Sequence, residues 1–293
     1  MSESGVRRTW EPPDLRGAVA VVTGASRGGG RGVALALGEC GATVYVTGRS
    51  VRGGPTTDGL PGTVDDAAEE VTARGGRGVA VRVDHAVDAE VEALFERVGR
   101  EQGRLDLLVN NAWGGYEGRD RTWNRPFWEQ PLWRWDRMLG VGLRSHLVAS
   151  HVAVRRLFLA QGRGLIVHTT VAMAPGYGGA LFYDVVKTAI NRMTVGMAHE
   201  LRPHGVAVLA LAPGWMRTEA VMADKPPHAR PPPDQLHRTH SPEYAGRAVA
   251  ALAADPAVLD RSGQLLPTAE VGRAYGFGDV DGRRVPVFDP DGG

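Results

Sequence analysis

Seven short runs rich in valine, alanine and leucine alternate along the chain with longer segments that carry apolar residues at helical spacing. Such alternation is typical of βαβ units, in which crossover helices join parallel strands. The expected strands span Ala18–Thr23, Ala42–Thr47, Gly78–Val83, Leu105–Val109, Gly164–Thr169, Val206–Leu211 and Gln264–Pro267. The pattern therefore predicts an α/β fold, a doubly wound parallel sheet of about seven strands with helices on both faces.

Helix signals lie between these strands. Thr63-Val-Asp-Asp has the form of a capping box and predicts the start of a helix. Another helix is expected to begin near Arg31, and the two longest helical segments run from about Pro131 to Ala160 and from Leu181 to Arg202.

No internal repeat and no linker of domain length interrupts the pattern. We therefore expect a single domain over residues 17–293, preceded by a flexible segment, residues 1–16. The proline-rich stretch Lys225–Pro233 is too short to separate two domains, and it indicates a mobile lid near residues 219–243 rather than a ligand for proline-binding domains. A tail, residues 268–293, follows the last strand.

Composition narrows the class of protein. Of the 293 residues, 43% are hydrophobic and 23% charged, and the formal net charge is +1, as in an ordinary soluble globular chain. No nucleic-acid or membrane surface is indicated, and we expect neither a signal peptide nor a transmembrane helix, hence a cytoplasmic protein. The lone Cys40 is expected to pack as a small buried hydrophobe.

A glycine-rich turn follows the first expected strand. Gly24, Gly28 and Gly30, with Ser26 and Arg27 between them, permit a tight turn and let backbone amides approach a pyrophosphate at the start of the next helix. Such a turn alone also fits a plain connecting loop. Its place between a strand and a helix, within a repeated βα pattern, favours dinucleotide binding in a Rossmann-like fold.

The end of the second strand indicates which dinucleotide binds. Sites for NAD usually place a carboxylate there for the ribose 2′-hydroxyl, whereas this chain has Arg49 and Ser50. A guanidinium can bind a 2′-phosphate through paired, charge-assisted hydrogen bonds, and Arg27 and Arg52 could add positive charge. We therefore expect NADP(H), although Arg49 could also be a solvated loop residue.

Tyr183 and Lys187 lie four residues apart in an expected helix, so their side chains share one face. An ammonium about 5 Å from a phenol favours the phenolate by about 3 kcal/mol at an effective dielectric constant of about 20, or by about two pKa units. Tyr183 would then be a usable acid near neutral pH. Most isolated pairs of this kind are solvated, but one that follows a dinucleotide turn indicates a nicotinamide-dependent oxidoreductase.

Four ordered motifs resemble those of the short-chain dehydrogenase/reductase family, over nearly the whole chain. They are the turn Thr23–Gly30, Asn110-Asn111-Ala112 with Trp113 in place of a glycine, the pair Tyr183 and Lys187, and Pro213-Gly214 with Thr218. Thr47-Gly-Arg, Val141-Gly-Leu-Arg and the stretch that begins Tyr275-Gly-Phe-Gly are especially similar to the family's member 1 type of dehydrogenase/reductase.

The resemblance implies how a cofactor is held. Asp84 would bind the adenine amino group, although it also fits a plain strand-end cap. Asn110 and Ala112 would line the cofactor cleft, and Lys187 would bond the nicotinamide ribose. The loop beside the nicotinamide would contain Pro213, Gly214 and Thr218.

The resemblance also assigns catalytic positions, with two departures. Thr170, thirteen residues before Tyr183, stands in place of the family's usual serine and keeps a hydroxyl for a substrate carbonyl. Gly142 stands where the family often has an asparagine that helps hold a water relay from the lysine. If the contact uses the main-chain carbonyl, glycine preserves it and also permits a kink. His146, one turn later, either assists or is structural.

The substrate is less clearly indicated. Five of the seven tryptophans lie between Trp113 and Trp135, as a substrate wall or equally as a hydrophobic staple or subunit contact. With Trp215 beside the expected nicotinamide pocket, a bulky apolar ketone or aldehyde fits, and the alcohol in the reverse reaction. The competing class is a catalytically silent NADP(H)-binding sensor or scaffold.

No metal is expected, because His199 and His204 are five residues apart and do not share a helix face as zinc-protease histidines do. The two longest helical segments resemble those that pair across subunits in the family. The resemblance therefore implies a homodimer or homotetramer.

Overall fold

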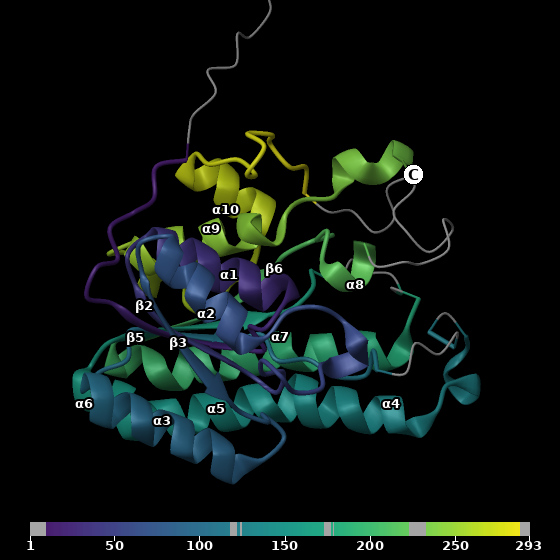
Figure 1. Ribbon diagram of the computed structural model, residues 1–293, viewed down its shortest axis with the longest axis horizontal. Coiled ribbons are helices and arrows are strands. Elements are labelled where there is room, and N and C mark those ends of the chain that lie inside the picture. The colour runs from purple at the N-terminus through teal and green to yellow at the C-terminus, as the bar shows by residue number, and fades with distance from the viewer. Residues whose placement is uncertain are drawn as a thin grey trace, which may run out of the picture.

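Seven parallel strands form one sheet in the order β3-β2-β1-β4-β5-β6-β7 (Figure 1). This computed structural model describes residues 10–117, 122–123, 125–172, 177, 179–222 and 233–287. The strands are β1 (Val19–Thr23), β2 (Thr43–Gly48), β3 (Arg77–Arg82), β4 (Leu107–Asn110), β5 (Gly164–Thr169), β6 (Val206–Ala212) and β7 (Leu265–Pro267). All seven expected strands are confirmed, with their ends within two residues of the predicted positions.

The order of the strands explains where a ligand site can form. Every residue of β1 and of β6 is buried, as expected for parallel strands covered on both faces, whereas the edge strand β3 begins and ends in the exposed Arg77 and Arg82. Successive strands step outward from β1 to β3, and the chain then returns to place β4 on the other side of β1. Doubly wound sheets bind ligands beyond the strand ends at such a reversal.

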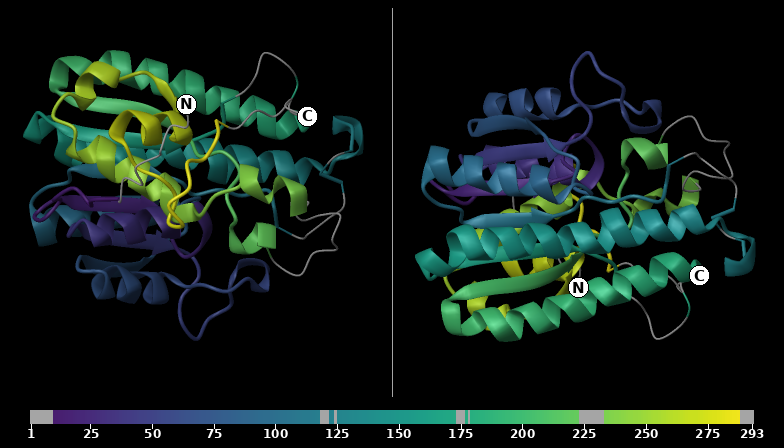
Figure 2. Two further views of the ribbon diagram at one scale, coloured as in Figure 1. Left: turned by 90° about the horizontal axis from the view of Figure 1, so that it is seen from above. Right: turned by 90° about the horizontal axis from the view of Figure 1, so that it is seen from below.

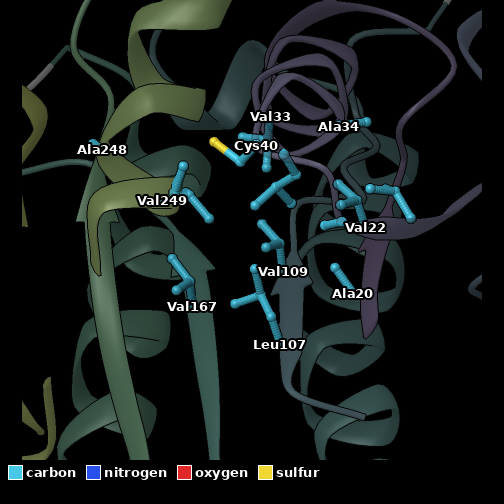
Figure 3. Packing of buried hydrophobic residues seen from close by; sticks show 14 of the residues in the cluster. Ala20, Val22, Val33, Ala34, Cys40, Leu107, Val109, Val167, Ala248 and Val249 are labelled. Atoms are coloured by element: carbon cyan, nitrogen blue, oxygen red, sulfur yellow. The ribbon is translucent and has the colours of Figure 1, made fainter. Parts of the chain in front are cut away.

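Helices cover both faces of the sheet (Figures 1 and 2). One face carries α1 (Gly28–Glu39), α2 (Val64–Ala73), α9 (Pro242–Ala254) and α10 (Thr268–Tyr275), and the other carries α3 (Asp88–Gln102), α5 (Ser145–Ala153) and α7 (Leu181–Leu201). Each face has its own apolar core. Figure 3 shows the first, where Cys40 packs near Val33 and Val249. Burial raises the pKa of the Cys40 thiol to about 12, consistent with the expected structural role.

Of two helix starts that the sequence predicted, one is confirmed and the other lies earlier in the chain. The Thr63 hydroxyl accepts a hydrogen bond from the Asp66 amide at 3.1 Å, so the predicted cap of α2 is confirmed. The helix after the glycine turn begins at Gly28, three residues before the expected Arg31, because the last glycines of the turn already form its first turn.

The long segment expected from about Pro131 to Ala160 is helical but not uniform. It contains α4 (Leu132–Arg137), a π-helical stretch η3 (Met138–Arg144), α5, a second π-helical stretch η4 (Val154–Phe158) and α6 (Leu159–Gln161). The stretch η3 holds Gly142, a residue type that permits a kink, and π-helical turns often occur at functional sites. It packs against α7.

The packed domain begins earlier than the expected residue 17. Residues 1–9 of the expected flexible segment lie outside the described residues, but the Trp10 ring packs edge-on against Phe277 and Leu15 is buried. Within the expected lid, the structure describes α8 (Glu219–Met222) and a 3-10 helix, η7 (Pro233–Arg238), while residues 223–232 lie outside it. The expected tail supplies α10 and the buried Asp279.

Candidate active site and cofactor cleft

The glycine turn is clamped to the end of β4. Gly24 has a φ of +66°, and a Cβ on it would lie 2.8 Å from the Cα of Ala112. The Thr23 hydroxyl accepts hydrogen bonds from the amides of Asn111 at 2.9 Å and Ala112 at 3.0 Å. The Asn111 side chain in turn donates to the carbonyl of Gly24 at 3.0 Å, and a Cβ on Gly30 would lie 2.5 Å from its nitrogen. These close approaches explain the glycines and hold the turn in one conformation.

A carboxylate already lies at the start of α1. The amide of Gly28 donates to Oε2 of Glu219, on α8, at 2.7 Å. Positive φ at Gly28 and the helix dipole aim backbone donors at this position, which is where a dinucleotide pyrophosphate binds in a strand-turn-helix unit. An anionic side chain at this position shows that the residues present suit an anionic cofactor.

Arginines surround the end of β2. The Arg27 guanidinium donates to the Ser50 hydroxyl at 2.8 Å and to the carbonyl of Gly62 at 2.8 Å, so it holds the loop that follows β2. Arg49 lies 3.6 Å from the carboxylate of Glu117. Arg52 points elsewhere and pairs with acidic side chains of α2. Among the three, Arg49 has the longest contacts, with Glu117 at 3.6 Å and the Thr57 hydroxyl at 3.4 Å.

The predicted Asn110 lies beneath the cleft rather than facing it. Its buried side chain donates to the hydroxyl of Ser150 at 2.9 Å and contacts His168, and His168 stacks on His146 with ring centroids 5.5 Å apart. His146 contacts the carbonyl of Ala112 at 3.2 Å. Burial lowers the pKa of His146 well below its usual value and that of His168 to about 3. Both rings are neutral, and His146 thus supports the β4 end.

The end of β3 also carries a predicted cofactor residue. The carboxylate of Asp84 accepts from the amide of Ala86 at 3.0 Å, which is the strand-end cap that the sequence left open. His85, the next residue, is buried against Thr47, and burial lowers its pKa to about 4.

Tyr183 and Lys187 share a face of α7, as expected, but their pKa values differ from the sequence expectation. Desolvation in an aromatic surround raises the pKa of Tyr183 to about 12, although a hydrogen bond from Tyr116 opposes the rise. Burial lowers the pKa of Lys187 to about 7. The expectation that the lysine charge makes Tyr183 acidic is wrong for the protein without a cofactor, because burial of the phenol raises its pKa and Lys187 does not offset that rise.

The aromatic segment surrounds Tyr183. Trp113 and Trp123 lie edge-on to the Tyr183 ring, with centroids 5.5 and 5.6 Å away, and Tyr116 packs between them. Trp135 packs on Phe182 on the neighbouring side of α7. Trp128 is 71% exposed and takes no part. The role of Tyr116 was missed, since nothing in the sequence distinguishes it within an aromatic run.

Gly142 has no room for a side chain, because the indole of Trp113 fills the adjacent space. A Cβ at position 142 would lie 2.6 Å from Cζ3 of that ring. The same ring carries the Lys187 ammonium over its face, 3.9 Å from the centroid. Two of the three departures from the family motifs, Trp113 and Gly142, are therefore in contact with each other.

Thr170 follows β5 and lies beside α7, but its hydroxyl is engaged. It donates to the side-chain oxygen of Asn191 at 2.6 Å. Asn191, which the sequence analysis did not single out, lies one turn after Lys187 on α7. The hydroxyl has a single proton to donate, so it can donate a hydrogen bond to a substrate oxygen only after its bond to Asn191 is broken.

The loop after β6 closes the far side of the site. Gly214 has a φ of +86°, and the preceding Pro213 carbonyl contacts Nε2 of His240 at 2.6 Å. Thr218 reaches the glycine turn, its methyl carbon 3.6 Å from where a Cβ of Gly28 would lie. A mainly apolar cleft lies here, lined by Val171, Ala172, Ala212, Trp215, Pro267, Ala269 and Val285 among others.

Within the part of the chain that the structure describes, no group of three His, Cys, Asp or Glu side chains could hold a metal ion. No helix among the described residues is long and apolar enough to span a membrane.

Comparison with known proteins is consistent with this geometry. The short chain dehydrogenase family matches residues 18–228. Dehydrogenase/reductase SDR family member 1 of Mus musculus is 44% identical over 286 residues, which cover 94% of this chain and 87% of that protein. The Homo sapiens protein of the same name is 43% identical, with the same coverage of 94% and 87%.

A solved structure agrees as well. A putative dehydrogenase from Xanthomonas campestris superimposes with a TM-score of 0.78 and 28% identity, covering 96% of this chain and 100% of that chain. The resemblance in the sequence motifs, including that to the member 1 type, is confirmed.

Proposed function

The chain belongs to the short-chain dehydrogenase/reductase family, and we propose that it is an NADP(H)-dependent member that interconverts a bulky apolar ketone or aldehyde and its alcohol. Family membership makes it an oxidoreductase that acts on alcohol or carbonyl groups with a nicotinamide cofactor. The single observation that carries the proposal is the convergence of the glycine turn, the Tyr183 and Lys187 pair and the Pro213 loop at one edge of the sheet.

The preference for the 2′-phosphate rests on the end of β2. Arg49 is partly exposed there, and its present partner Glu117 is 3.6 Å away, a distance at which the pair is weakly held. A phosphate would offer the guanidinium two oxygens in paired geometry. Ser50, held by Arg27, adds a hydroxyl at the same place.

The residues divide the chemical work. When bound, the nicotinamide supplies the hydride for reduction or accepts it in oxidation. Tyr183 donates its phenolic proton to the carbonyl oxygen, Thr170 orients that oxygen after leaving Asn191, and Lys187 stabilises the resulting phenolate. Lys187 would also hydrogen-bond the ribose of the bound cofactor. Water would return the proton to the pair, with the main-chain carbonyl of Gly142 as a hydrogen-bond acceptor that holds the water and needs no side chain.

The substrate class follows from the walls of the site. Trp113, Trp123 and Tyr116 enclose the Tyr183 ring, and the cleft beside Trp215 is mainly apolar. These surfaces suit an apolar carbonyl compound, because aromatic rings and the apolar side chains beside Trp215 make up most of the described walls.

A silent NADP(H)-binding sensor or scaffold is the second candidate. It is favoured by the Tyr183 hydroxyl, which is hydrogen-bonded to Tyr116 inside the aromatic cluster, and by its raised pKa. Cofactor binding alone would then be the function.

A panel of ketones and aldehydes separates the two candidates. We expect NADPH oxidation with the bulkier apolar members of the panel. Tyr45→Phe should show the same turnover as the parent, because the Tyr45 hydroxyl lies away from the site, where it donates a hydrogen bond to Glu101 at 2.7 Å. Tight NADPH binding without oxidation by any carbonyl, and without NADP⁺ reduction by the matching alcohols, would favour the sensor.

A further inference from the structure

Lys187 has an unusual set of partners for a buried ammonium. Within the described part of the chain its only hydrogen-bond acceptor is the carbonyl of Thr169, at 3.3 Å, although an ammonium has three donors. Among the described residues no carboxylate offsets its burial, since desolvation alone shifts its pKa. Its other contacts are two aromatic rings: the Trp113 ring, whose centroid lies 3.9 Å away, and the Tyr183 ring, at 5.6 Å near the outer limit of a cation–π interaction.

Trp113 reaches this position because position 142 has no side chain. A Cβ there would lie 2.6 Å from Cζ3 and 2.8 Å from Cε3 of the indole. An indole in this place and an asparagine at position 142 therefore exclude each other. The same ring stands edge-on to Tyr183, with an interplanar angle of 74°, so one rigid group contacts both members of the pair.

We propose that Trp113 is a positioning residue, whose indole face holds the Lys187 ammonium beside Tyr183 in place of the side chain that Gly142 lacks. This inference rests on the proposed function, in which Lys187 stabilises the phenolate. A ring face attracts a cation without offering a proton acceptor, so it favours the charged form of Lys187 in a site that otherwise desolvates it. The ionisable groups nearest to Lys187 are Tyr183 on its own helix and His146 on α5, and His146 is neutral.

The composition of the chain makes this testable on the protein itself. Lys187 is one of two lysines among 34 Lys and Arg residues, the other being Lys225. Lysine labelled selectively with carbon-13 and nitrogen-15 therefore gives two side-chain NMR signals, which Lys225→Arg assigns. Protons above an indole face resonate upfield, so the Lys187 signals of the folded protein should lie upfield of their positions in the unfolded chain.

The variants distinguish an aromatic face from simple packing. Trp113→Leu keeps apolar volume but removes the ring, and we expect it to abolish the ring-current shift and lower the Lys187 pKa by about one unit. Trp113→Phe should keep part of both effects. Gly142→Asn, which forces the indole away, should act like Trp113→Leu, and Trp128→Leu, at an exposed tryptophan, should match the parent.

Activity gives a second, separate readout. The dependence of kcat on pH should shift to lower pH in Trp113→Leu, following the lowered Lys187 pKa. Trp113→Phe, which keeps a ring, should show a smaller shift. Lysine signals that are unshifted in the parent, or equal in Trp113→Leu and the parent, would overturn the positioning role even if carbonyl reduction still requires Tyr183. Absence of turnover in the parent would overturn the proposed function, whatever the lysine signals show.

Discussion

Glu219 on α8 accepts a hydrogen bond from the backbone amide of Gly28 at the start of α1, at 2.7 Å. This contact joins the first residues of the expected lid to the point where the pyrophosphate of a dinucleotide would lie. The carboxylate and the cofactor cannot both use this donor. We therefore expect Glu219 to leave the Gly28 amide when a cofactor binds there.

We predict that Glu219→Gln binds NADPH more tightly than the parent, by about twofold to fivefold. The side-chain amide of the variant can still accept a hydrogen bond from the backbone N–H of Gly28, but it carries no charge that repels the pyrophosphate. A charge near a helix N-terminus changes the interaction free energy by about 0.3–1 kcal/mol. Titration calorimetry at low salt measures the difference, with Glu96→Gln on α3 as the control. Equal affinities in Glu219→Gln and the parent would show that the carboxylate does not compete.

Arg49 should decide the choice of cofactor. We expect NADPH to bind more tightly than NADH, and Arg49→Asp to reverse the order by removing a charge-assisted contact of about 1.5–3 kcal/mol and repelling the phosphate. Arg52→Ala, which breaks only pairs with α2, should leave the preference unchanged. The same titrations test this, and equal affinities for both cofactors in the parent would refute it.

Much of this architecture could be predicted from the sequence, because it depends on residues that are close together along the chain. Buried parallel strands are continuous apolar runs, so β1 and β6 were predictable, and the Thr63 cap needs only residues three positions apart. The pairing of Tyr183 and Lys187 follows from helical spacing alone. That only two lysines occur in the chain was a further signal for Lys187, since arginine cannot lose its proton as lysine can.

The remaining features depend on contacts between distant parts of the chain. Asn111 holds the glycine turn from a position 87 residues away, and Glu219 lies 191 residues from Gly28. The pKa of Tyr183 reflects how completely Trp113 and Trp123 surround it, which no spacing rule expresses. Trp113 and Gly142 looked like two unrelated departures until their contact was visible.

Buried histidines should make the fold sensitive to acid. The folded-state pKa values of His85 and His168 are lowered to about 4 and about 3, and that of His146 is also lowered. As the pH falls below about 6.5, the unfolded chain takes up protons that the folded chain excludes, so stability is present above that pH and is lost below it. Each histidine contributes up to about 1.4 kcal/mol per pH unit.

Urea unfolding between pH 7 and pH 4 measures this dependence. We expect His168→Asn to lose stability less steeply than the parent, by about one proton, whereas His199→Asn, at an exposed site, should follow the parent. Identical slopes for His168→Asn and the parent would mean that His168 is not held neutral.

A homodimer or homotetramer is expected in solution. Leu147 on α5 and Val185 on α7 are 49% and 43% exposed, on the helices whose counterparts were expected to pair between subunits. Light scattering at micromolar concentration should give a mass of two or four chains, and a monomer alone would contradict the expectation.

The most direct test of the account compares Tyr183→Phe with Lys187→Ala in carbonyl reduction by NADPH. Tyr183→Phe should bind NADPH within about twofold of the parent yet lose nearly all turnover, because proton donation by a positioned acid contributes about 10²–10⁴-fold to the rate. Lys187→Ala should weaken both binding and turnover. A Tyr183→Phe variant that reduces the carbonyl as fast as the parent would contradict the assignment of Tyr183 as the proton donor.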